Sequence, residues 1–254
     1  MPRLAANLSL LFTERPLIDR FGAARAAGFA GCELLFPYDH AADDLARAAE
    51  AAALPVVLIN TPGGDWAGGE RGQAAIPGAE ARFRAEFQQA LVMAEALGAE
   101  FVHVLAGLAD GTAARATYLD NLRWAAREAA ERLPDLRLTI EPINRHDMPG
   151  YFLSDFNAAE AILAEIDAPN LGLQFDAYHA QRITGDARAA WAGLARRPVH
   201  VQVAGVPGRH EPLGGDIDYP AMFALLDAEG YAGWVSAEYH PEGRTEDGLG
   251  WLTG

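Results

Sequence analysis

Short apolar runs alternate with longer segments of helical periodicity along almost the whole chain. Each run is rich in β-branched and other apolar residues and gives way to polar or glycine-rich sequence, which is typical of a buried strand. The runs that fit this description cover residues 4–8, 31–36, 55–59, 101–105, 136–140, 171–175, 198–203 and 233–238. The pattern therefore predicts eight short, mostly apolar strands.

Amphipathic segments fill the intervals between these runs, and glycines such as Gly98 and Gly230 follow several of them. We predict helices over residues 16–27, 42–52, 79–97, 113–133, 154–165 and 220–229, with one or two more over residues 177–195. Ser154 is the predicted N-cap of its helix. So little chain follows the eighth strand that the last helix should be short or missing.

Strands and helices alternate without the change in composition that would mark a linker, so we predict one domain over residues 1–254. The expected architecture is α/β, a single (β/α)8 TIM barrel. An open doubly wound sheet is the alternative, but no glycine-rich dinucleotide fingerprint follows the first strand. Residues 61–78 form an unusually long loop, whose tryptophan and mixed charges favour a folded lid over a linker.

Composition narrows the possible functions. The formal net charge of −15 argues against a nucleic-acid partner, which requires a basic face. All 20 basic residues are arginines, so no lysine can form a Schiff base with a carbonyl substrate. The N-terminus lacks the apolar region of a signal peptide, and no apolar run is long enough to cross a bilayer. With a single cysteine, Cys32, the chain is expected to be cytoplasmic, without disulfides or a membrane partner.

Four consecutive strands end in side chains that carry oxygen: Glu141, Asp176, Gln202 and Glu238. They recur about once per βα repeat, so in a barrel they should converge on one mouth. Three carboxylates pushed together repel one another and resist ionising, and a divalent cation removes that cost. An all-oxygen ligand set selects a hard ion such as Mg²⁺ or Mn²⁺. The sequence therefore predicts a metal site formed by these four residues.

Further polar residues lie near the same strand ends or in the long loop. The candidates for substrate binding are Asn7, Asn60, Arg71, His103, Asp147, His179, Arg209 and Glu211. The two asparagines end the first and third strands, and the arginines are candidate partners of a substrate carboxylate. A lone strand histidine such as His103 is more often a packed core residue, and each arginine has an alternative interpretation as a surface residue.

These motifs resemble the xylose-isomerase-like barrel family of sugar isomerases and epimerases. The resemblance extends nearly from end to end and is most specific in two motifs, GDWAGGERG at residues 64–72 and EPIN at residues 141–144. Residues 174–179 (QFDAYH), 209–212 (RHEP) and 238–239 (EY) also match. Within the family the chain is most similar to the hydroxypyruvate isomerase branch.

The resemblance implies a metal-assisted isomerisation that interconverts hydroxypyruvate and tartronate semialdehyde. The family's metal ligands carry over to the four strand-end residues, and its two proton-transferring glutamates carry over to Glu141 and Glu238. Such a reaction passes through an enediolate, whose charge a metal ion stabilises. The expected partner is a small hydroxy or oxo acid. A homo-oligomer is also considered, because a missing last helix would leave one flank of the barrel uncovered.

Two departures from the family's ketose epimerases favour the acid substrate: Gln202 stands where those enzymes have a histidine, and Asp147 where they have a glutamate. A sister isomerase or ketose 3-epimerase acting on a longer substrate, such as a 2-oxo-tetronate, stays open. A metal-dependent endonuclease on the related barrel would need histidine ligands and a basic groove. A sugar-acid binding module would not need two opposed glutamates.

Overall fold

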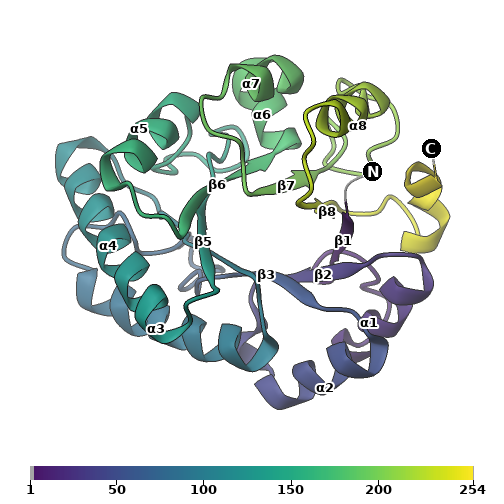
Figure 1. Ribbon diagram of the computed structural model, residues 1–254, viewed down its shortest axis with the longest axis horizontal. Helices are drawn as coiled ribbons and strands as arrows, with labels where there is room; N and C mark the ends of the chain where they lie inside the picture. The colour runs from purple at the N-terminus through teal and green to yellow at the C-terminus, as the bar shows by residue number, and fades with distance from the viewer. Residues whose placement is uncertain (1–2, 254) are drawn as a thin grey trace.

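Eight parallel strands close into a barrel in the computed structural model, which describes residues 3–253. The strands are β1 Arg3–Asn7, β2 Gly31–Leu34, β3 Val56–Asn60, β4 Phe101–His103, β5 Arg137–Ile140, β6 Leu171–Asp176, β7 His200–Val203 and β8 Trp234–Ala237. Each strand pairs in parallel with the next, and β8 pairs with β1 to complete the ring. Figure 1 shows this ring at the centre with helices around it. The predicted (β/α)8 barrel is confirmed.

Helices cover the outside of the barrel. They are α1 Leu17–Ala26, α2 Ala42–Ala52, α3 Glu80–Leu97, α4 Gly111–Arg132, α5 Phe156–Ile166, α6 Ala177–Thr184, α7 Ala187–Gly193 and α8 Tyr219–Ala228, with a 3₁₀ turn at Pro37–Asp39. After β8 the described chain forms only a 3₁₀ helix, Thr245–Thr253, which confirms the short last element. This yellow segment in Figure 1 lies beside the start of the chain, where Phe12 N donates to Thr245 Oγ1 at 2.6 Å.

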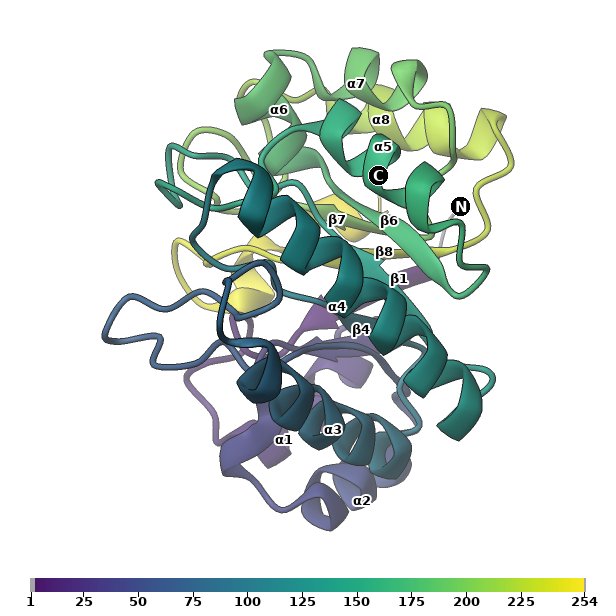
Figure 2. The same ribbon diagram turned by 90° about the vertical axis from the view of Figure 1, so that its left-hand side faces the viewer.

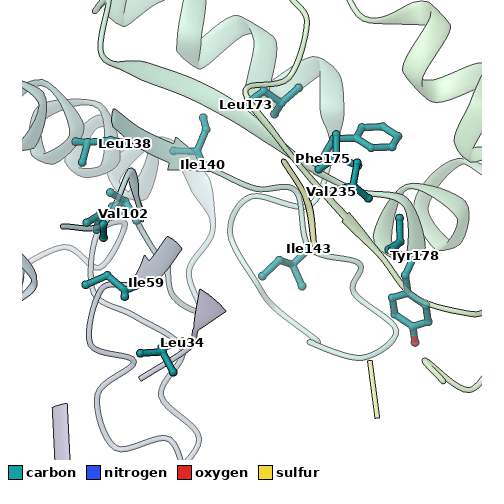
Figure 3. Close-up of a cluster of buried hydrophobic side chains, with 14 of the residues drawn as sticks. Leu34, Ile59, Val102, Leu138, Ile140, Ile143, Leu173, Phe175, Tyr178 and Val235 are labelled. Carbon is teal, nitrogen blue, oxygen red and sulfur yellow. The ribbon is translucent and has the colours of Figure 1, made fainter. Parts of the chain in front are cut away.

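The outward faces of the strands form one large apolar core with the helices. Members labelled in Figure 3 include Leu34, Ile59, Val102, Leu138, Ile140, Leu173, Phe175 and Val235. Burying a side chain of this size stabilises the fold by roughly 1.5–3 kcal/mol. These residues alternate with inward-facing ones, as the two-residue period of a strand requires.

The inward-facing residues change from apolar to polar along the strands. A small separate cluster near their N-terminal ends contains Ala5, Leu58, Phe101 and Trp234. Further along the same strand faces come the buried polar residues Asn7, His103 and Ser236. The barrel therefore has an apolar floor, and its polar side chains lie toward the C-terminal ends of the strands, where TIM-barrel active sites form.

The long loop between β3 and α3 is folded, as predicted. Ala75 N donates to Ala106 O at 2.7 Å, which joins the loop to the segment after β4. Arg82 donates two hydrogen bonds to the Glu70 carboxylate, at 2.7 and 2.6 Å, which join it to α3. In Figure 2 this blue loop projects to the left of the barrel.

Two local predictions need correction. Ser154 does not cap α5, because Asp155 is the N-cap and its Oδ1 accepts from Ala158 N at 2.8 Å. Several strands are also shorter than predicted. For example, β4 ends at His103, and Leu105 N donates to Thr61 Oγ1 in the loop after β3 at 3.1 Å. Among the described residues, none of the helices is both long and apolar enough for a membrane span.

Candidate active site

The four strand-end residues predicted as metal ligands lie at one mouth of the barrel. Asp176 ends β6 and Gln202 lies within β7, whereas Glu141 and Glu238 directly follow β5 and β8. The strand register places Asp176 beside Gln202. All four are buried, with exposed fractions of 4% for Glu141, 1% for Asp176 and Gln202, and 8% for Glu238. Three acids and one amide thus share a site that is largely closed to water.

One arginine bridges two of these acids. Arg209 Nη2 lies 3.1 Å from Asp176 Oδ2 and 3.3 Å from Glu238 Oε2. Arg209 lies in the loop after β7 and has a φ of +55°, in the left-handed region. Its N–H donates to Gly205 O at 2.8 Å, and its carbonyl accepts from His240 N at 2.9 Å. These bonds hold the residue in a conformation that non-glycine residues rarely adopt.

Burial and crowding raise the pKa of every acid in this group. Burial is the main cause for Glu141, followed by repulsion from Glu238 and Asp176, and the pKa lies well above its usual value. Burial also raises the pKa of Asp176, and it raises the pKa of Glu238 to about 8 against the opposing effect of Arg209. Burial alone would lower the pKa of Arg209, but the three carboxylates raise it. One guanidinium does not neutralise three carboxylates, so the site favours further positive charge.

The orientation of the His179 ring follows from its neighbours. Asn144 Oδ1 accepts two backbone N–H groups of the following turn, both at 3.0 Å. Its amide nitrogen therefore faces Asp147 Oδ2 at 2.9 Å and His179 Nδ1 at 2.7 Å. Burial lowers the pKa of His179 well below its usual value, so the ring is neutral. Because Nδ1 accepts, the proton resides on Nε2, which lies 3.7 Å from Asp176 Oδ2.

The donor set fits a hard divalent cation. One ligand atom each from Glu141, Asp176 and His179 lie within 4.8 Å of one another. A protonated Nε2 makes His179 a poor ligand, which leaves the acids and the Gln202 amide oxygen. Glu141 Oε1 is buried and has no hydrogen-bond partner among the described residues. A bound cation would satisfy such an oxygen, and oxygen ligands suit Mg²⁺ or Mn²⁺.

Other buried polar atoms at this mouth also have no hydrogen-bond partner within residues 3–253. They include His103 Nε2 and Arg209 Nε. His103 Nδ1 lies 3.7 Å from Glu141 Oε2, and burial lowers the His103 pKa to about 3, so this ring is neutral as well. Native proteins leave few buried polar atoms unpaired. This concentration therefore indicates a place where a polar ligand completes the hydrogen bonding.

Asp147 and Tyr178 form the polar rim of the site. Asp147 Oδ2 accepts from Tyr178 OH at 2.6 Å, and Oδ1 lies 3.8 Å from Arg182 Nη2. Partial burial would raise the pKa of Asp147, but hydrogen bonds from Asn144 and Tyr178 lower it to about 2. The Arg209 guanidinium lies 5.0 Å from the centre of the Tyr178 ring. Asp147 is thus an ionised group joined to the site through its neighbours.

Three other predicted substrate-binding residues have different surroundings. Arg71 lies 4.2 Å from the Trp66 ring centre and donates to the carbonyls of Trp66 and Glu70 at 2.9 and 2.6 Å. The Glu211 carboxylate accepts from Glu242 N at 3.2 Å, which joins the β7 loop to the C-terminal segment. Asn60 Oδ1 is buried and unpaired among the described residues. The roles of these three in substrate binding stay predictions.

A second polar layer, missed from the sequence, lies beneath the acids. Glu33 on β2 is fully buried and accepts from Gln202 Nε2 at 3.0 Å and from Asn7 Nδ2 at 3.2 Å. Asn7, predicted to bind substrate, therefore faces this layer. Gln174 Nε2 donates to Gln202 Oε1 at 2.7 Å and to Glu141 Oε2 at 3.2 Å. A signal was present, because a glutamate within the apolar run GCELLF is not explained by a solvated surface.

Comparisons with known proteins place this geometry in a family. The profile described as xylose isomerase-like TIM barrel matches residues 21–254. The chain is 48% identical over 260 residues to the 2-oxo-tetronate isomerase of Cupriavidus necator, covering 99% of this chain and 98% of the relative. It is 39% identical over 256 residues to the hydroxypyruvate isomerase of Escherichia coli, covering 99% and 98%.

A solved structure is similar over the full length. The crystal structure of AP endonuclease, family 2 from Brucella melitensis superposes with a TM-score of 0.95 at 43% identity, covering 100% of this chain and 98% of that one. The fold, the profile and the full-length relatives agree. The chain belongs to the xylose isomerase-like TIM barrel family, in which its full-length relatives include proteins named isomerases.

Proposed function

We propose that the protein is a metal-dependent isomerase that exchanges the carbonyl and hydroxyl groups of adjacent carbons in a short hydroxy-oxo acid. The observation that carries the proposal is the convergence of five side chains on one buried mouth: Glu141, Asp176, His179, Arg209 and Glu238. They combine carboxylates that can move a proton, a cation for a substrate carboxylate, and a donor for substrate oxygens. Relatives named isomerases support the same reaction class.

The proposed metal ligands are Glu141, Asp176, Gln202 and Glu238. A Mg²⁺ or Mn²⁺ ion held there would supply the positive charge that stabilises an enediolate. The raised pKa values of the three acids support this assignment, because a cation offsets the burial and the repulsion that resist their ionisation.

Glu141 and Glu238 are the proposed proton carriers. One carboxylate takes the proton from the hydroxyl-bearing carbon, the C–H electrons form the enediolate double bond, and the carbonyl π electrons move to oxygen. The same or the opposite carboxylate then returns a proton to the former carbonyl carbon. Without a metal ion, burial raises the pKa of Glu238 to about 8, whereas a bound cation would favour the ionised form that acts as the base. The former hydroxyl oxygen passes its proton to the former carbonyl oxygen and becomes the new carbonyl, and His179 Nε2 can donate a hydrogen bond to a substrate oxygen during this transfer.

Arg209 is the proposed partner of the substrate carboxylate. Its Nη2 already donates to Asp176, whereas its Nε is buried and unpaired in the described part of the chain. A guanidinium can hold a carboxylate through parallel hydrogen bonds. Arg71 donates to loop carbonyls instead, so Arg209 is the better placed of the two.

Two substrate lengths fit this reaction. The sequence motifs favour hydroxypyruvate, which would be interconverted with 2-hydroxy-3-oxopropanoate (tartronate semialdehyde). The Cupriavidus necator relative, at 48% identity, is named 2-oxo-tetronate isomerase, which favours an acid with one more hydroxylated carbon. We therefore keep a 2-oxo-tetronate as the second candidate substrate. An endonuclease is disfavoured, because the net charge of −15 opposes nucleic-acid binding.

Rates on both acids test the proposal. Purified protein is assayed with hydroxypyruvate and with a 2-oxo-tetronate, in the presence of Mg²⁺, Mn²⁺ or EDTA. We expect turnover of at least one acid, loss of turnover with EDTA and recovery on adding the metal ion. The ratio of the two kcat/KM values assigns the substrate length. Turnover of neither acid with either metal would contradict the proposal, and calorimetric binding without turnover would indicate a binding module.

A further inference from the structure

A buried carboxylate lies beneath the proposed metal ligands and takes no part in the steps above. Glu33 has an exposed fraction of 0% and lies on the inner face of β2. Its Oε2 accepts from Gln202 Nε2 at 3.0 Å and from Asn7 Nδ2 at 3.2 Å, and its Oε1 contacts His200 Nε2. Burying a charged group is costly unless its partners compensate, so its presence at this position needs a physical explanation.

The contacts of Glu33 fix the direction of the Gln202 amide. A carboxylate can only accept hydrogen bonds, so the NH₂ end of Gln202 must face Glu33. The oxygen end then faces Gln174 Nε2, at 2.7 Å. Gln174 is oriented in the same sense, because its own Oε1 accepts from Thr139 Oγ1 at 2.8 Å and its Nε2 also donates to Glu141 at 3.2 Å. The Gln202 oxygen thus accepts from the same Gln174 NH₂ group that donates to Glu141.

The orientation of the side-chain group matters for an amide ligand but not for a carboxylate ligand. The carboxylates of Glu141, Asp176 and Glu238 each present two equivalent oxygens, whereas the amide of Gln202 has two ends of similar shape and opposite polarity. Only the oxygen end can bind a hard cation. A reversed amide would place N–H groups against the cation and would no longer accept from Gln174.

We propose that Glu33 is a positioning residue that turns the carbonyl oxygen of Gln202 toward the metal ion. The inference rests on the proposed metal site and adds a residue to it. Groups that orient a metal ligand from outside typically change metal affinity by about 10- to 100-fold when they are replaced. Glu33 should therefore control Mn²⁺ affinity through the position of its own acceptor oxygen beside Gln202, and not through its charge.

Two substitutions separate geometry from charge. Glu33→Asp keeps the charge but shortens the side chain, so its oxygens no longer reach Gln202. Glu33→Gln removes the charge but keeps an acceptor oxygen at the same distance. Its new NH₂ group can face His200 Nε2, since His200 Nδ1 is unpaired among the described residues and can carry the ring proton instead.

Calorimetric titration with Mn²⁺, without substrate, measures the effect. We expect Glu33→Asp to weaken Mn²⁺ binding about tenfold or more and Glu33→Gln to stay within about threefold of the wild type. Thermal melting checks that each variant is folded at the titration temperature. Weak binding by Glu33→Gln with normal binding by Glu33→Asp would show a charge effect and overturn the inference, as would unchanged binding in both variants.

The Gln202→Ala background gives a second measurement. If Glu33 acts through Gln202, Glu33→Asp should cause little further loss of Mn²⁺ affinity there, because the ligand that it orients is gone. An undiminished loss in this background would mean that Glu33 acts otherwise and would overturn the inference. A wild-type protein that binds no Mn²⁺ would overturn the metal site together with it, whereas normal binding by Glu33→Asp overturns the inference alone.

Discussion

Glu238 is a buried carboxylate that we propose as a proton carrier. Replacing it with glutamine keeps the shape of the side chain but removes the base. We expect Glu238→Gln to lower kcat by about 10²- to 10⁴-fold. The melting temperature should stay the same or rise, because one of three repelling acids is gone. Glu131→Gln, on the exposed part of α4, is the matched control. Steady-state kinetics of both variants measure this effect. A fully active Glu238→Gln variant would show that Glu238 is not a proton carrier.

The Asn144 amide sets the tautomer of His179, so reversing its polarity should change the reaction. Asn144→Asp has the same shape but presents an acceptor to His179 Nδ1. The ring proton should then move to Nδ1, and the site loses the Nε2–H donor. We expect kcat to fall about tenfold or more, by analogy with other histidines forced into the wrong tautomer. Nitrogen NMR of the His179 ring gives the tautomer directly; an unchanged spectrum with normal kcat would refute this role.

Site residues that recur at a regular spacing along the chain could be predicted from the sequence. Site residues whose position depends on contacts between distant segments could not. Glu141, Asp176, Gln202 and Glu238 recur once per βα repeat, so the barrel symmetry alone places them together. Nothing in the sequence shows that Asn144 holds His179 or that Glu33 faces Gln202, because these partners come together only when the barrel closes. Metal and substrate roles for all of these residues stay predictions.

At the scale of elements, hydrophobic periodicity predicts where the helices and strands lie more accurately than it predicts where they begin and end. The prediction of residues 42–52 coincides with α2, because apolar alanines and Leu45 mark one face of that helix. The predicted N-cap of α5 is one residue early, since Ser154 and Asp155 are both good caps and only the backbone geometry selects one. Strand ends were overextended where apolar residues continue into buried loops, as they do after His103.

Two glycines of the long loop give a matched test of how tightly it is packed. Gly72 has a φ of +101°, and a Cβ there would lie 2.5 Å from Leu105 O. Gly69 has a φ of +99°, but a Cβ there would meet no atom within 4 Å. Gly69→Ala should therefore cost only the backbone strain, about 1 kcal/mol, and Gly72→Ala clearly more. Thermal unfolding measures both, and equal melting temperatures would contradict the packing of this loop.

At the scale of the whole molecule, the buried acids couple stability to pH. Their raised pKa values mean that the folded protein keeps protons that the unfolded chain has released above pH 4.5. The protonated acids therefore contribute to the free energy of unfolding at low pH, and this contribution is lost as the pH rises. For Glu238 the loss occurs as the pH passes through about 8. Metal-free protein should lose several degrees of melting temperature between about pH 5 and pH 8.

Mn²⁺ should reverse this loss. Because the cation favours the ionised acids, the gain in melting temperature on adding Mn²⁺ should be larger near pH 8 than near pH 5. The Glu238→Gln variant, with one acid fewer, should show a smaller pH dependence without metal. Melting curves with EDTA and with Mn²⁺ at both pH values make the comparison. A Mn²⁺ effect that is larger at low pH would contradict the assignment of these acids as ligands.

The architecture of the whole chain was the most predictable feature. Eight alternations of strand and helix leave a closed barrel as the simplest arrangement. The sequence also predicts a short or missing last helix, and the structure has a 3₁₀ helix there. The interior was harder to predict, because each inward-facing side chain contacts residues from several strands. The apolar floor and the polar layer above it are properties of the closed ring and not of any one segment.

We propose that oxygens from the last four strands hold one hard cation at the barrel mouth. Anomalous diffraction from crystals grown with Mn²⁺ tests it most directly. We predict one manganese peak per chain, about 2.0–2.3 Å from oxygens of Glu141, Asp176, Gln202 and Glu238, with the NH₂ group of Gln202 still facing Glu33. A mouth without manganese, or a manganese ion bound by His179 with Gln202 turned away, would contradict this metal site.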